Sequence, residues 1–71
     1  MSESGYDFVD LAGTSEISWE DATKNIIEVA ARTLRDLRVA EISRLDVKIR
    51  DNQIVKYRVR LRLSFKYEQE E

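Results

Sequence analysis

Arginine occupies every second position near the end of the chain, at Arg58, Arg60 and Arg62. Residues two apart in an extended strand share a face, so these three guanidinium groups would form one row. Guanidinium groups bind phosphate and carboxylate through paired hydrogen bonds. The row is therefore a candidate site for an anionic ligand, such as a phosphate. It would equally suit ion pairs between copies of the chain, or a solvated face.

A second kind of chemistry is suggested by the carboxylates of Glu41, Asp46 and the acidic tail at 68–71. Calcium and other divalent cations need several converging oxygens, and the sequence contains no spacing of the EF-hand type. One chain alone is therefore not predicted to hold a cation, and a cation site at a symmetry axis stays open. The chain has no His and no Cys, which removes the usual zinc, iron–sulfur and haem ligands and the Ser–His and Cys–His catalytic pairs. With no general acid or base to name, we predict that the protein is not an enzyme.

The net charge of −2 hides a strong segregation. Residues 1–30 carry seven Asp or Glu and one Lys, whereas residues 31–66 carry eleven Lys or Arg and four acids. Halves of opposite sign can attract copies of the same chain. Nucleic acid is not favoured as a partner, because the aromatic residues of the last strand alternate to the face opposite its basic ones.

Length and composition point to one small domain spanning residues 1–71, with an ordered part at about 6–67. No apolar run approaches ~20 residues, so no membrane partner is predicted. The acidic N-terminus does not resemble a secretory signal, and we predict a cytoplasmic protein. No disulfide is available, and so small a core rarely suffices by itself. Association with further copies is one of the few remaining sources of stability.

The first half of the chain predicts a strand and a helix. Residues 6–12 read as a strand that a turn at 13–15 ends. Ser18 is the expected helix N-cap, with Asp21 three residues later. The helix is predicted from Trp19 to Leu37, where apolar residues follow a helical period. Trp19 is expected to pack over the junction of helix and sheet.

The second half predicts two strands and a hairpin. The apolar pattern of residues 39–49 breaks parity, which indicates a bulge near Ser43 or Arg44. Asp51 and Asn52 are expected to form the turn. Residues 57–67 then alternate without a break. The predicted fold class is α+β, a βαββ subunit with a three-stranded antiparallel sheet wrapped around one helix. One helix covers only part of such long strands, so the rest of the sheet needs partners.

Several of these segments resemble dodecins, in the right order and over nearly the whole chain. The resemblance rests on residues 9–15 (VDLAGTS), 18–22 (SWEDA), 37–42 (LRVAEI) and 57–66 (YRVRLRLSFK). It implies a βαββ subunit and a hollow homododecamer. It also implies that a small-molecule ligand, flavin as riboflavin or FMN, is stored between subunits without catalysis.

The resemblance also assigns candidate site residues. In flavin-binding members a tryptophan stacks on the flavin ring, and its position here is Val39. A glutamine of the third strand contacts the ring edge, and its position here is Arg58. Together with Arg60 of the arginine row and the carboxylate of Glu41, the candidate ligand-binding residues are Val39, Glu41, Arg58 and Arg60. Lack of the stacking tryptophan resembles a subgroup described as calcium-associated, which leaves a structural or ion-associated dodecamer without flavin as the alternative.

Overall fold

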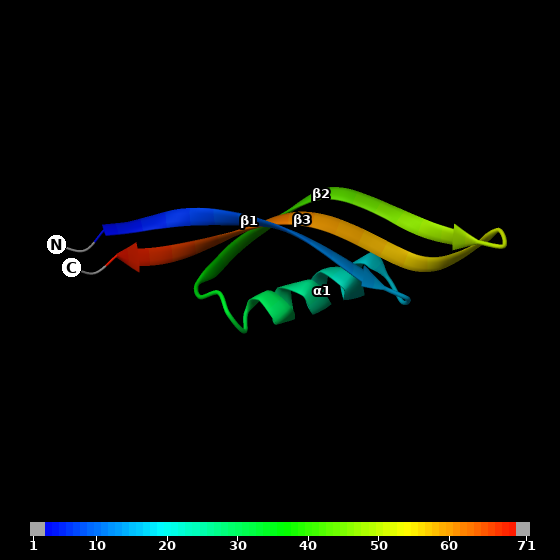
Figure 1. Cartoon of the computed structure of the whole chain (residues 1–71), viewed down its shortest axis with the longest axis horizontal. Coiled ribbons are helices and arrows are strands. Elements are labelled where there is room, and N and C mark those ends of the chain that lie inside the picture. The colour runs from blue at the N-terminus through cyan, green and yellow to red at the C-terminus, as the bar shows by residue number, and fades with distance from the viewer. Residues whose placement is uncertain (1–2, 70–71) are drawn as a thin grey trace.

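A computed structural model describes residues 3–69 of the chain. The elements are β1 (Glu3–Ser15), α1 (Trp19–Ala30), β2 (Leu37–Arg50) and β3 (Gln53–Gln69). The strands form one antiparallel sheet in the order β1-β3-β2. The sheet is long and twisted, α1 lies beneath its middle, and the start of β1 and the end of β3 lie at the same end of the sheet (Figure 1). The predicted α+β fold with βαββ order is confirmed.

The central strand β3 separates an apolar face from a charged one. Val59, Leu61 and Leu63 are almost completely buried and face α1, on what we call the inner face. Arg58, Arg60 and Arg62 alternate with them and lie on the opposite, outer face. This is the period of two that the sequence shows, and burial of three adjacent apolar side chains fixes which face is which.

The segment that connects β1 to α1 is shorter than the sequence predicts. Strand β1 continues through Ser15, so the turn expected at 13–15 is wrong and the bend lies at Glu16–Ile17. Gly13 pairs with Val59 within the strand, and α1 crosses it closely: a Cβ there would lie 3.0 Å from the Ala22 carbonyl oxygen. The Ser18 hydroxyl accepts a hydrogen bond from the Asp21 N–H, which confirms the N-cap.

Helix α1 is shorter than the predicted helix over Trp19–Leu37. It ends at Ala30, and a tight turn follows in which the N–H of Thr33 donates to the Ala30 carbonyl. Asp36 then has a φ of 56°, which reverses the chain into β2. The apolar period beyond Ala30 is real, but Leu34 and Leu37 contact the core from the turn and from β2. Leu34 and Leu37 therefore show helical spacing in the sequence although neither lies in a helix.

Strand β2 carries the predicted irregularity. Ile42 pairs with Leu61 and Arg44 with Arg60, so Ser43 is the extra residue of a bulge. Two further register shifts lie between Leu37 and Val39 and between Lys48 and Ile49, which the sequence did not indicate. The hairpin turn at Asp51 and Asn52 is confirmed, and both residues have positive φ.

The inner face of β2 is left largely uncovered. Helix α1 packs over β1 and β3. On β2, the inner side chains of Ile42, Leu45 and Ile49 are 43%, 51% and 61% exposed. The molecule measures 59 × 19 × 13 Å, so the twelve residues of α1 cannot reach along the whole sheet at ~1.5 Å per residue.

Over residues 3–69, no helix is long and apolar enough to cross a membrane. The tail that the sequence separates at 68–71 is divided: Glu68 and Gln69 belong to β3, and residues 70–71 lie outside the described part.

Candidate functional site

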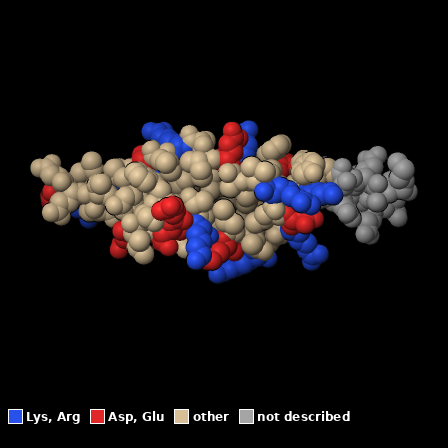
Figure 2. All heavy atoms as spheres, turned by 180° about the vertical axis from the view of Figure 1, so that it is seen from behind, with Lys and Arg blue, Asp and Glu red and all other residues tan. Residues whose placement is uncertain are grey.

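The outer face is organised in rows of three residues, one from each strand. Arg62 lies between Asp10 of β1 and Glu41 of β2, and Arg60 lies between Ala12 and Arg44. Seen from behind Figure 1, charged side chains of both signs gather over the middle of the molecule (Figure 2). In the same view, the hairpin end of the molecule is covered mostly by residues other than Lys, Arg, Asp and Glu.

Two of the three row arginines already have carboxylate partners within the chain. The Arg62 guanidinium donates to both Asp10 carboxylate oxygens, at 3.0 and 3.4 Å. The Arg58 guanidinium donates to both oxygens of Asp46, at 2.6 and 2.9 Å. These hydrogen bonds hold the pKa of Asp10 and of Asp46 below the ordinary 3.8 and raise the pKa of each arginine. Both pairs are exposed, so we assign them a geometric role rather than a large stabilising one.

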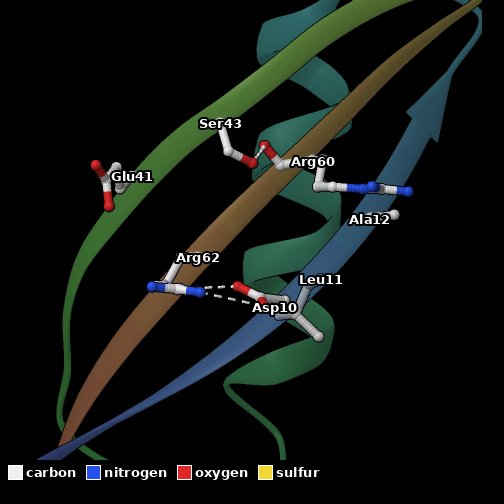
Figure 3. A pocket seen from close by; sticks show the side chains of 7 residues that line it. All are labelled: Asp10, Leu11, Ala12, Glu41, Ser43, Arg60 and Arg62. Carbon is white, nitrogen blue, oxygen red and sulfur yellow. Dashed lines mark hydrogen bonds and ion pairs between the residues drawn. The ribbon is translucent and has the colours of Figure 1, made fainter.

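Arg60 is different. Within residues 5–66, it forms no ion pair and no side-chain hydrogen bond. Its side chain runs across Ala12 toward β1, where the small neighbour leaves room, while Glu41 sits on the opposite side of the hollow (Figure 3). The hollow has a volume of about 630 Å³. Its lining residues are Asp10, Leu11, Ala12, Glu41, Ser43, Arg60 and Arg62.

The structure brings only some of the candidate ligand residues together. Glu41 and Arg60 line the same hollow. Val39 is 62% exposed and pairs with Ser64, whose hydroxyl bonds both the N–H and the carbonyl of Val39. Arg58 pairs with Asp46 instead.

Val39 and Arg58 are too far apart to share one ligand within one chain. The β3 neighbour of Val39 is Ser64, six residues beyond Arg58. At ~3.3 Å per residue, the two positions lie roughly 20 Å apart. A flavin contacting residues at both positions would therefore need two copies of the chain.

On the inner face, Trp19 closes the junction between helix and sheet. Its indole N–H donates to the Asp46 carbonyl at 3.0 Å, and its ring meets Tyr57 edge-on at 5.3 Å. This confirms the predicted packing role. Beside it, a mainly apolar groove of about 410 Å³ is lined by Trp19, Glu20, Thr23, Lys24, Ile42 and Leu45.

No cluster of three or more His, Cys, Asp or Glu side chains occurs where the structure describes them. Glu41 and Asp46, the two carboxylates considered for a cation, lie on either side of the bulge, and Asp46 is occupied by Arg58. Within one chain, the described residues therefore offer no converging set of oxygens for calcium.

Sequence reasoning missed Asp10 and Arg44 as members of this face. Asp10 is an even number of residues from the other outer residues of β1, so the sequence could have predicted that it lies on the outer face. Its partner was not, because pairing with Arg62 depends on the register between strands 52 residues apart in sequence. Arg44 reaches the outer face only through the Ser43 bulge.

Comparison with known proteins agrees with this geometry. The family model described as Dodecin matches residues 6–68. The calcium dodecin of Mycobacterium tuberculosis is 35% identical over 61 residues, covering 86% of both chains. A dodecin structure from Streptomyces coelicolor is 31% identical, with a TM-score of 0.89 over 99% of this chain and all of that one. A crystal structure of the calcium-chelating calcium dodecin from M. tuberculosis is 33% identical, with a TM-score of 0.78 over 86% of this chain and 87% of that one. The chain belongs to the dodecin family.

Proposed function

We propose that this chain assembles into a non-catalytic homododecamer that binds or stores a small molecule between its copies. The ligand expected from the family resemblance is a flavin, riboflavin or FMN. The cytoplasm is the compartment we expect. The observation that carries the proposal is the division of the candidate site: residues at the two family ligand positions, Val39 and Arg58, lie on one face but roughly 20 Å apart.

The need for further copies has independent support on the inner face. The buried apolar core of the described residues consists of Ala22, Ala30, Val59, Leu61 and Leu63. A core of this size is small for a stable domain without disulfide or metal. The uncovered inner side chains of β2 are the apolar surface that another copy would bury, at about 25 cal/mol per Å².

A second candidate is the same assembly without flavin, associated with calcium or another divalent cation. Three observations favour it. Val39 offers no aromatic ring for stacking, a contribution on the order of 0.5–1.5 kcal/mol. Arg58 is held by Asp46 in a bidentate ion pair, so its guanidinium is not available to a ring edge unless that pair breaks. A relative 35% identical to this chain is named calcium dodecin.

One set of solution measurements separates the two candidates. The molar mass should be about 100 kDa, twelve times the 8.3 kDa chain. Titration of the assembled protein into riboflavin and into FMN should quench flavin fluorescence saturably if flavin is the ligand. A saturable calcium isotherm without flavin quenching would select the second candidate. A stable monomer would contradict both.

Two variants test the reasoning residue by residue. Val39→Trp restores an aromatic face and should raise flavin affinity, whereas Lys48→Trp, on the same face toward the hairpin, should not. Leu45→Ser should weaken assembly because it removes apolar surface from the inner face. Lys48→Ser is its control, since it changes the same strand on the outer face. An assembled Val39→Trp protein that still ignores flavin would refute our placement of the pocket.

A further inference from the structure

The Ser43 bulge sets two arginines opposite each other. In an unbroken ladder Ser43 would face Arg60 and Arg44 would turn to the inner face beside Val59. The extra residue shifts the register, so Arg44 pairs with Arg60 on the outer face. The Ser43 hydroxyl donates to the Arg60 carbonyl at 3.1 Å, a side-chain contact within the bulge. Like charges directly opposite each other destabilise an antiparallel pair, so this arrangement is unfavourable by itself.

The charge around this pair is not balanced within the chain. A second hollow, of about 190 Å³, is lined by Ala12, Arg44, Asp46, Arg58, Val59 and Arg60. It contains three guanidinium groups and one carboxylate. The Asp46 carboxylate accepts hydrogen bonds from Arg58 at 2.6 and 2.9 Å, and it forms only a longer ion pair with Arg44, whose Nε lies 3.6 Å away, beyond hydrogen-bonding distance.

The neighbouring carboxylate, Asp10, acts on Arg60 only through its charge and accepts no hydrogen bond from it. Asp10 is bound bidentately by Arg62. Arg60 therefore extends over Ala12 with its donors unpaired by any side chain among residues 5–66 (Figure 3). An anion placed between Arg44 and Arg60 would remove their repulsion and receive donors from two planar forks.

We propose that Arg44 and Arg60 form a phosphate-binding site on the outer face, for inorganic phosphate or the phosphate of a phosphomonoester. The site lies within one chain, so it depends neither on flavin binding nor on the positions of Val39 and Arg58. Phosphate fits because it is a compact oxyanion of high charge that accepts bidentate hydrogen bonds from each arginine. Arg58 and Asp46 border the site as an ion pair and are not ligands.

Calorimetric titration of inorganic phosphate into the assembled protein tests the site, with sodium chloride at matched ionic strength as the blank. Saturable binding at millimolar phosphate is expected. Arg44→Gln and Arg60→Gln should each weaken it about tenfold or more. Arg50→Gln is the control, because Arg50 is an exposed arginine near the hairpin turn and outside the hollow. Arg60→Lys keeps the charge without the fork and should also weaken binding.

The outcomes divide cleanly. Absence of saturable heat in the wild-type protein overturns the proposal whatever the variants do, and so does unchanged binding in both Gln variants. Loss of the assembled mass in Arg60→Gln, without phosphate binding in the wild type, would mean that a carboxylate of another copy occupies the hollow, and it also overturns the proposal. Glycerol phosphate distinguishes the sources: tighter binding than inorganic phosphate identifies an ester, and equal binding identifies the free ion.

Discussion

Gly13→Ala tests how closely α1 is seated on the sheet. Gly13 lies on the inner face of β1, where an added Cβ would meet the Ala22 carbonyl oxygen at 3.0 Å and the Ile26 Cβ at 3.0 Å. Neither neighbour can move away easily, because the Ala22 carbonyl belongs to the helix backbone and the Ile26 Cβ is bonded directly to it. The φ of Gly13 is not positive, so alanine adds no backbone strain. The substitution therefore isolates one packing contact.

The expected cost follows from two opposing effects. Inserting a methyl group into a packed contact costs typically about 1–3 kcal/mol. Replacing glycine by alanine lowers the conformational entropy of the unfolded chain, which raises the free energy of unfolding by about 0.4–1 kcal/mol. Taking the middle of both ranges, the net destabilisation should be about 1.3 kcal/mol. For a chain of this size, each kcal/mol lowers Tm by roughly 4–8 °C.

Circular dichroism during heating measures this change. Chain concentration must be held fixed, because an assembling protein has a concentration-dependent Tm. Thr14→Val is the control, since Thr14 is exposed on the other face of the same strand and should change stability by less than about 0.5 kcal/mol. A Tm for Gly13→Ala equal to or above the wild-type value would refute the close seating of the helix.

Three further predictions concern contacts around the site. The folded pKa values of Asp10 and Asp46 lie below the ordinary 3.8, so each carboxylate stabilises the fold above about pH 4 and loses this effect as pH falls through the folded value. Thermal unfolding should therefore show a smaller loss of Tm on acidification in Asp10→Asn and Asp46→Asn than in the wild type; identical slopes would contradict it. Trp19→Phe keeps a ring but removes the 3.0 Å indole hydrogen bond and should lower the unfolding free energy by about 1 kcal/mol in urea. Ser15→Ala deletes a nearly buried hydroxyl that bonds the start of α1 and should cost about 1–3 kcal/mol by the same assay, with a change near zero counting against its role.

The order of elements and the face of each strand were predictable because burial imposes a local period. In β3, alternation alone separated Leu61 and Leu63 from Arg60 and Arg62, and the structure agrees. The end of α1 was not predictable in this way. Leu34 and Leu37 continue the helical spacing, yet they reach the core from a turn and from a strand. Periodicity reports which side chains are buried, and several backbone paths can bury the same ones.

The candidate site was less accessible from the sequence than the fold. A row of arginines could be read, but which of them remain unpaired could not. That distinction depends on register: Arg62 meets Asp10 and Arg58 meets Asp46, whereas Arg60 meets Ala12 and Arg44. Register between β1 and β3 depends on how the sheet packs against α1, which is not a property of any short segment, and register between β2 and β3 shifts at the Ser43 bulge.

The two faces of the sheet give different reasons for the chain to have partners. On the inner face, Leu45 and Ile49 leave apolar area in water, and the hydrophobic effect favours covering it with any complementary apolar surface. On the outer face, bidentate pairs already neutralise Arg58 and Arg62, so a copy of the chain gains little there from them. Around the Ser43 bulge, Arg44 and Arg60 are the guanidinium groups that no bidentate pair neutralises. Assembly is therefore best sought through the inner face of β2, and ligand chemistry through the outer face, where substitutions can be made without removing the exposed apolar surface of the inner face.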